Sequence, residues 1–210
     1  MALAGVAFAE ETIATDYTGQ FAWDSSSAPT LTFEGEFADC PLTFVLSTEA
    51  AYKTTTYLPG TFTPDVNVGN GGTWTLSFTA TNESSEAITL TGMNLGLFSF
   101  NAGGATQGND TKRTITLTLS GDLTGVKQHE TVGASTGSLG TVALTLDNAV
   151  EISAGKSITF DLTVSRVTEM GTFVGLNSAT VKTMQLVPEP TTATLSLLAL
   201  AGLAARRRRK

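Results

Sequence analysis

Glu34 and Glu36 are the acidic pair whose spacing best suits chemistry. They stand two residues apart in a segment that alternates like a strand, so we expect both side chains on one face, about 6.6 Å apart along the backbone. Glycoside hydrolysis uses two carboxylates at a comparable separation. The opposite face would carry Leu31, Phe33 and Phe37, so the pair also fits the solvated outer face of a sheet. We favour the outer-face interpretation because surface carboxylates are common.

Two groups of acidic and amide side chains suggest calcium ligands. In the first group Gly69 occupies the third ligand position of an EF-hand pattern, and no distal Glu follows at the right spacing. Turn formation explains both groups better, because Asp and Asn favour turns. The first group is Asp65, Asn67 and Asn70, and the second is Asp147, Asn148 and Glu151. The sequence therefore predicts neither a metal site nor a cofactor.

Cys40 and His129 are the only cysteine and the only histidine of the chain. Ser-His-Asp triads, Cys-His pairs and histidine-based zinc sites are therefore poorly supported, and we expect no enzymatic activity. A single thiol also excludes an internal disulfide. We interpret Cys40 as a small residue at a strand end before Pro41.

Tyr52 and Tyr57 are the candidate sugar-binding residues. They bracket residues 53–56 within 50–72, the longest stretch without clear alternation. Sugars stack on exposed aromatic rings beside hydrogen-bonding groups, and long loops on a rigid scaffold often carry function. The alternative, which we favour, is that both tyrosines pack over the rim of the core. Trp74 is expected to be buried.

Alternation of apolar and polar residues is the strongest structural signal, and it indicates strands with one buried face. It is clearest at residues 73–81, where Trp74, Leu76, Phe78 and Ala80 share one face. Between Met93 and Phe100 the alternation slips by one residue, which predicts a bulge near Gly96. Shorter alternating segments lie at 31–37, 42–46, 88–90, 115–119, 142–146 and 158–164, with weaker candidates at 21–23 and 173–186.

Turn-forming residues separate these segments, for example at 82–85, 121–122, 147–148 and 154–155. Nine or ten short strands with polar outer faces fit two antiparallel sheets packed face to face, because a single sheet would leave its apolar face in water. We therefore predict an all-β, antiparallel two-sheet β-sandwich. The number of strands favours a jelly-roll-like arrangement over an immunoglobulin-like one.

The C-terminal residues have three parts with different physical roles. The two prolines of Pro188-Glu189-Pro190 keep this segment out of sheets and helices, so it should be extended and accessible to a peptidase. The apolar run 191–205 would span about 22 Å as one short transmembrane helix, which requires a thinned bilayer. A basic cluster then acts as a stop-transfer signal and leaves the C-terminus cytoplasmic. It consists of Arg206, Arg207, Arg208, Arg209 and Lys210.

This order of parts resembles the PEP-CTERM sorting signal of Gram-negative bacteria. The resemblance covers about 24 of the 210 residues. It implies that an exosortase, a protease embedded in the inner membrane, cuts near Pro188-Glu189-Pro190. It also implies a cell-surface or extracellular-matrix location, because members are often linked to extracellular polysaccharide.

The domain boundaries follow from the two ends. Residues 1–9 fit a truncated signal peptide, since Ala7, Phe8 and Ala9 before Glu10 form a small-x-small cleavage pattern. Residues 10–186 then form one exported domain, and 187–210 form the sorting and anchoring segment. Without Glu189 and the five terminal cations, 7 basic residues face 18 acidic ones, a net charge of −11. This charge disfavours nucleic acid.

The sequence thus predicts an exported, non-catalytic surface or matrix protein. A secreted carbohydrate-binding module is the first alternative, and a glycan-active hydrolase is the second.

Overall fold

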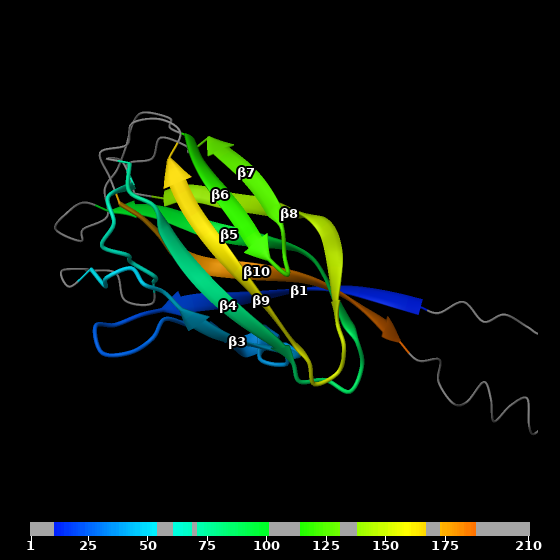
Figure 1. Cartoon of the computed structure of the whole chain (residues 1–210). Helices are drawn as coiled ribbons and strands as arrows, with labels where there is room; N and C mark the ends of the chain where they lie inside the picture. Colours follow the sequence, from blue (N-terminus) through cyan, green and yellow to red (C-terminus); the bar gives the residue numbers. More distant parts are fainter. Residues whose placement is uncertain are drawn as a thin grey trace, which may run out of the picture.

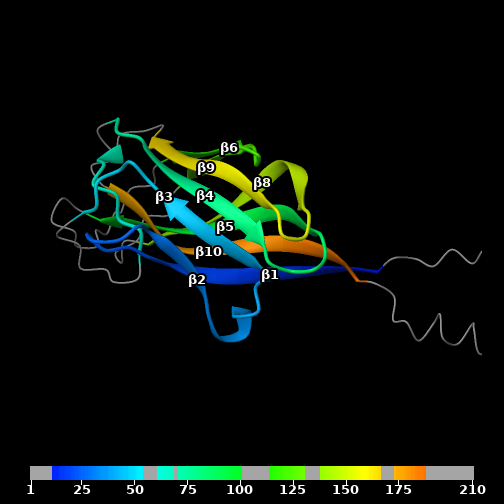
Figure 2. The same ribbon diagram turned by 60° about the horizontal axis from the view of Figure 1, so that its bottom comes forward.

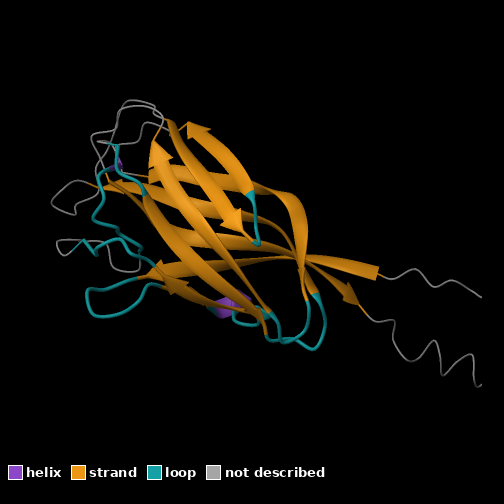
Figure 3. Ribbon diagram, viewed as in Figure 1, coloured by secondary structure: helices purple, strands orange, loops and turns teal. Residues whose placement is uncertain are grey.

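The computed structural model describes residues 11–53, 61–68, 71–100, 114–130, 138–166 and 173–187. In this part of the chain nearly all regular structure is strand, as Figure 3 shows, and Gly35–Phe37 form a short helical turn, η1. The strands are β1 Glu11–Ala22, β2 Thr30–Phe33, β3 Leu42–Ser47, β4 Trp74–Asn82, β5 Ile88–Phe100, β6 Thr114–Gly121, β7 Gly125–Glu130, β8 Ser138–Ile152, β9 Ser157–Arg166 and β10 Phe173–Val187.

Ten strands form two five-stranded sheets that pack face to face (Figures 1 and 2). One sheet has the order β2-β1-β10-β5-β8 and the other the order β3-β4-β9-β6-β7. Every strand pair is antiparallel. The prediction of an antiparallel two-sheet β-sandwich is confirmed.

The core between the sheets follows the alternation seen in the sequence. In β4 every second residue from Trp74 to Asn82 is buried, as predicted, and Trp74 itself is 2% exposed. The neighbouring strand β9 repeats the pattern, so that the rings of Phe78 and Phe160 stack with centroids 4.8 Å apart. Burying large apolar side chains of this kind contributes roughly 1.5–3 kcal/mol each, which makes this layer the main stabilising element.

The predicted bulge near Gly96 is confirmed, but the extra residues lie on the neighbouring strands. Leu176 pairs with Leu97 and Ser178 with Gly96, so Asn177 of β10 has no partner on β5. On the other side Leu139 of β8 is the unpaired residue, between the pairs Leu97–Gly140 and Phe98–Ser138. A Cβ on Gly96 would collide with the side-chain oxygens of residues 177 and 178, which explains the glycine.

The turn predicted at residues 147–148 is wrong. Both residues belong to β8, which bends there without ending. Leu90 pairs with Val150 but Gly92 pairs with Thr145, so four residues of β8 have no partner on β5. Asp147 instead donates its backbone N–H to the carbonyl of Thr124, which ties the bend to the opposite sheet.

Strands β1 and β10 bring both ends of the sandwich to one pole. They pair from Glu11–Val187 to Gln20–Ser178. Figures 1 and 2 show these two strands extending together past the other strands at the end where residues 11 and 187 lie. Residues 1–9 and the C-terminal residues 188–210, including the expected transmembrane helix, lie outside the described residues. Within the described ranges no helix is long and apolar enough to cross a membrane.

Candidate functional site

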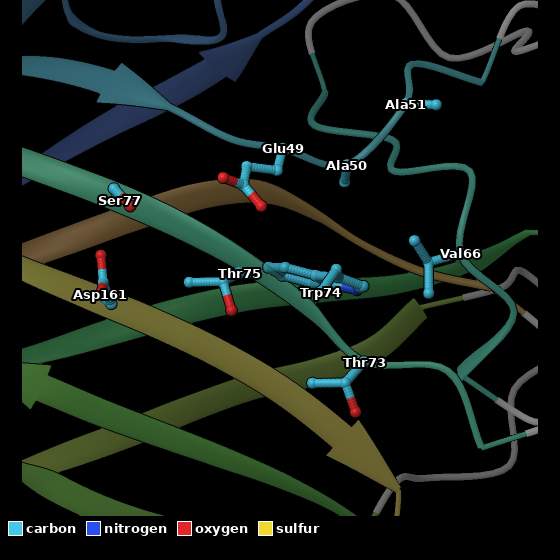
Figure 4. A pocket seen from close by; sticks show the side chains of 9 residues that line it. All are labelled: Glu49, Ala50, Ala51, Val66, Thr73, Trp74, Thr75, Ser77 and Asp161. Carbon is cyan, nitrogen blue, oxygen red and sulfur yellow. The ribbon is translucent and has the colours of Figure 1, made fainter.

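A groove on the outer face of the β4–β9 sheet is the candidate site. Its volume is about 590 Å³, within the usual range for small-molecule sites. Three structural parts form it: the start of β4, the segment after β3 and one residue of β9. Its lining residues, shown in Figure 4, are Glu49, Ala50, Ala51, Val66, Thr73, Trp74, Thr75, Ser77 and Asp161.

The alternation of β4 supplies the floor of the groove. Because Trp74 points into the core, Thr75 and Ser77 must point outward. The wall is set by Thr48, whose hydroxyl donates to the carbonyl of Thr75 at 2.6 Å and accepts from the Ala50 N–H at 3.1 Å. These two bonds direct the chain after β3 across β4 and hold Glu49 at the edge of the groove.

Two carboxylates face the groove. Figure 4 shows that of Glu49 directed over β4 and that of Asp161, on the neighbouring strand, directed toward β4. Asp161 lies opposite Ser77 in the β4–β9 register. Neither carboxylate accepts a hydrogen bond or forms an ion pair with any residue that the structure describes. With Trp74 almost fully buried, the groove offers oxygen atoms and little aromatic surface, which suits a hydroxyl-bearing ligand.

Tyr52 lies beside this groove in a row of aromatic rings. It meets the half-buried Trp23 edge-on at 5.1 Å, and Trp23 stacks on Phe62 at 4.8 Å. Phe62 in turn contacts Trp74 at 5.2 Å, so the row runs from the rim into the core. The second predicted platform residue, Tyr57, lies outside the described residues.

Trp23 is an aromatic residue at the rim that the sequence interpretation missed. Its indole N–H donates to the carbonyl of Ser27 at 3.0 Å, across the turn between β1 and β2. Asp24 closes that turn by accepting from the backbone N–H and the hydroxyl of Ser26, both at 2.8 Å. The backbone N–H is the main cause that lowers the pKa of Asp24 below its ordinary value. The Asp-Ser-Ser-Ser sequence after an aromatic was the available signal.

The strand predicted for Glu34 and Glu36 is wrong. β2 ends at Phe33, and Gly35, with φ +62°, begins the helical turn η1. The Phe37 N–H donates to the Glu34 carbonyl at 3.2 Å, a turn bond that an extended strand cannot make. Both carboxylates are exposed and do not share a sheet face. The prediction failed because Gly35, between the two acids, adopts a left-handed conformation and ends the strand.

For the two groups considered as calcium ligands, the described residues bring together no three Asp, Glu, His or Cys side chains. Asp65 forms an ion pair with Lys53 at 2.7 Å, and Lys53 also lies over the Phe173 ring at 4.6 Å. Asn70 lies outside the described residues.

His129 contacts the Leu139 carbonyl through Nε2 at 2.8 Å, so it links β7 to β8.

Cys40 is half-buried between η1 and β3 and makes no disulfide. Burial raises the pKa of its thiol to about 11, with a further contribution from Asp39. The same surroundings raise the pKa of Tyr17, first through burial and then through Asp39 and Cys40. A thiol that stays protonated at neutral pH is a poor nucleophile.

Comparison with solved structures gives matches of low similarity. A family two carbohydrate esterase from Cellvibrio japonicus is 12% identical, with TM-score 0.27, and the match covers 85% of this chain and 36% of that one. A family GH115 4-O-methyl-alpha-glucuronidase with specificity for decorated arabinogalactans is 14% identical, with TM-score 0.28, over 68% and 16%. A chain of infectious bursal disease virus, Gx strain, is 12% identical, with TM-score 0.29, over 90% and 54%.

The chain therefore spans little more than half, or less, of the length of each of these structures. TM-scores this low establish no shared function. No curated protein sequence matches the chain.

One family model matches, that of the PEP-CTERM protein-sorting motif, and it covers residues 186–210. The match begins at Leu186, so its first two residues are the last two of β10. It includes every residue of the proline-containing segment, the apolar run and the basic cluster that the sequence singled out. The chain thus carries a PEP-CTERM protein-sorting motif, which implies processing by an exosortase, export and transit through a membrane.

Proposed function

We propose that this chain is an exported, non-catalytic protein of the cell surface or extracellular matrix, sorted and cut through Pro188-Glu189-Pro190. The observation that carries the proposal is the position of the sorting motif directly at the end of β10. β10 is the last described strand in the chain and the central strand of its sheet, and Pro188 follows it directly. Cutting after residue 187 would release the whole sandwich and would remove no core residue from it.

The apolar run 191–205 acts as the membrane segment while the chain is uncut. Arg206 to Lys210 hold its end on the cytoplasmic side, by the positive-inside rule. The pairing of Glu11 with Val187 supports this arrangement, because both ends of the domain then face the membrane and the opposite pole faces outward. We also propose a jelly-roll-like topology for the domain. It is supported by the way in which β7, β8, β9 and β10 alternate between the two sheets.

Replacing Pro188, Glu189 and Pro190 together by Ala tests the proposal in the producing cell. The parent chain should appear briefly in the inner membrane and then in the surface or matrix fraction. The triple variant should stay uncut in the membrane. Equal processing and equal location of the two chains would leave a plain membrane anchor and overturn the sorting proposal.

Carbohydrate binding is a second candidate function, and the groove over β4 is the observation that favours it. Thr73, Thr75 and Ser77 present hydroxyl groups along its floor, and Tyr52 and Trp23 lie beside it at the rim. Because the exported part is strongly acidic, the glycan should be neutral, and Tyr57 with Tyr52 remains the proposed stacking pair. Loss of one stacking contact should cost about 1 kcal/mol, roughly fivefold in affinity.

Calorimetric titration with neutral oligosaccharides tests this second function. Tyr52→Ala and Ser77→Ala should each weaken binding, whereas Thr43→Ala, on β3 outside the groove lining, should not. Absence of binding at millimolar glycan would reject this second function.

A glycan-active hydrolase is a third possibility, and the Glu49 and Asp161 carboxylates are the pair that would carry out the hydrolysis. Hydrolysis of the bound oligosaccharide, abolished in Asp161→Asn, would be needed to support it.

A further inference from the structure

The paired ends of β1 and β10 form a ribbon at the base of the domain, consisting of residues 11–15 and 183–187. β2 joins β1 only from Gly19 onward, so the ribbon has one free edge. On its other edge β5 accompanies β10 only as far as Gln185. The last rungs, Thr12 with Leu186 and Glu11 with Val187, therefore have no further strand on either side among the described residues.

This ribbon concentrates exposed apolar side chains. Of the five large hydrophobic side chains exposed in the described residues, three lie here: Ile13 at 48%, Met184 at 39% and Leu186 at 49%. Residues that face each other across an antiparallel pair share a face, and successive rungs alternate. Leu186 and Met184, opposite Thr12 and Ala14, are thus on one face, and Ile13, opposite Gln185, is on the other. A protein partner that packs on a sheet covers one face, whereas lipid contacts both.

The charges of the ribbon also fit a membrane surface. Residues 12–15 and 183–186 carry no charge, although the exported part as a whole has a net charge of −11. The first charged residues further along the ribbon, Asp16 and Lys182, form an ion pair at 3.2 Å. Glu11 at the tip is the exception, and a carboxylate is tolerated in a hydrated headgroup layer better than in hydrocarbon.

The sequence between the ribbon and the apolar run is short. Four Cα steps separate Val187 from Thr191, which is about 14 Å at full extension. The polar headgroup layer outside the hydrocarbon is itself roughly 5–8 Å thick. The ribbon can therefore be held no more than roughly 6–9 Å clear of the headgroups, and its apolar residues favour closing that gap.

We propose that, while the chain is uncut, the tip of the ribbon rests in the lipid headgroup layer on the side of the inner membrane that faces the exported domain. The proposal rests on the membrane segment in residues 191–205 that is part of the proposed function. Contact of Ile13, Met184 and Leu186 with lipid fixes Pro188 at the bilayer surface, where a membrane-embedded protease can reach it. The two ends of the domain, residues 11–15 and 183–187, then form its contact with the membrane.

Site-directed fluorescence on the full chain tests the proposal. A polarity-sensitive fluorophore is attached to single cysteines at Ile13→Cys or Met184→Cys, in a Cys40→Ser background. Val126→Cys is the matched control, because Val126 is an apolar residue 67% exposed on β7, away from the ribbon. The chains are reconstituted into phosphatidylethanolamine–phosphatidylglycerol vesicles without protease, and insertion is checked by flotation.

Spin-labelled headgroup lipids should quench the fluorophore at positions 13 and 184 about twofold or more above the level at 126, as expected for interfacial burial. Equal quenching at all three positions in chains that float with the vesicles would overturn the proposal and leave the anchor intact. Chains that do not float with the vesicles would overturn both the ribbon proposal and the proposed membrane segment. A blue shift at position 13 without lipid quenching would assign the ribbon to a second copy of the chain and also overturn the proposal.

Discussion

Asn82 links three segments of the fold through a buried amide, and replacing it by Asp should destabilise the domain. Its side chain is fully buried, and Nδ2 donates to the carbonyls of Glu86 at 2.7 Å and Ile152 at 2.8 Å. Its Oδ1 accepts from the N–H and the hydroxyl of Ser84. The end of β4, the following turn and the end of β8 in the opposite sheet are thereby joined.

The expected loss follows from these partners. The Ser84 hydroxyl lies 2.8 Å from the Glu86 carbonyl, and its single proton can go either to this carbonyl or to the side chain of residue 82. The Ile152 carbonyl loses its side-chain donor and instead faces a carboxylate. An unsatisfied buried acceptor costs roughly 1–3 kcal/mol, and burying the charge adds to it, so we expect a loss of about 3 kcal/mol at neutral pH. For a domain of this size that lowers Tm by about 6–12 °C.

The pH dependence identifies the cause. Burial beside carbonyl oxygens raises the pKa of the introduced carboxyl above its usual range. Because the folded-state pKa is raised, protonation favours the fold: the deficit relative to the parent is largest above this pKa and shrinks as the pH falls through it. The protonated carboxyl can again donate to one carbonyl.

Thermal and urea unfolding of the chain ended after Val187, at pH 7 and at about pH 4, measures this difference. Asn148→Asp is the control, because Asn148 is exposed and should change stability by less than about 0.5 kcal/mol. Equal stability of Asn82→Asp and the parent at pH 7, or a deficit that stays constant with pH, would refute the reasoning.

Three further predictions concern single features. The Cys40 thiol, with a pKa of about 11, should react with a disulfide reagent at pH 8 at least ~tenfold more slowly in the folded chain than in urea. Its stabilising contribution should be lost as the pH rises through about 11, seen as a falling urea midpoint. Gly175→Ala should cost about 1–3 kcal/mol in urea unfolding, because its Cβ would lie 2.7 Å from the Phe98 ring and closer still to the Phe62 carbonyl. Deleting Arg206 to Lys210 should weaken membrane retention of the uncut chain in fractionation, since in the proposed arrangement those charges hold the stop-transfer end inside.

Strands with one buried face could be predicted from the sequence, and those without could not. β4 is buried at every second residue, so its alternation is complete. β7 buries only Gly125, with Val126 exposed, because it is an edge strand, and its sequence Gly-Val-Lys-Gln-His-Glu shows no period. β1 was recognised only near Phe21, since its outer half pairs with β10 and faces solvent. Strands β1 and β7 are held in their sheets mainly by backbone hydrogen bonds, which do not depend on the type of side chain and so cannot be recognised from the sequence.

The candidate groove could be predicted only in part. The irregular stretch after residue 50 was identified as a place for function, and Ala50, Ala51 and Val66 do line the groove. Asp161 could not be found from the sequence, because it reaches the groove through the register that sets it beside Ser77. Trp23 was missed for the same reason, since its neighbours Tyr52 and Phe62 are distant in sequence.

The sorting motif, in contrast, is a linear signal and is readable without a fold. The consequence that we propose for it is a cut next to the end of β10, and the mass of the exported protein measures that cut most directly. Intact-mass and C-terminal peptide analysis of the protein from the surface or matrix fraction should show a loss of about 2 kDa from the C-terminal side, as expected for removal of some twenty residues. The new C-terminus should lie near Pro188-Glu189-Pro190. An exported protein that still ends in Arg206 to Lys210 would contradict the account.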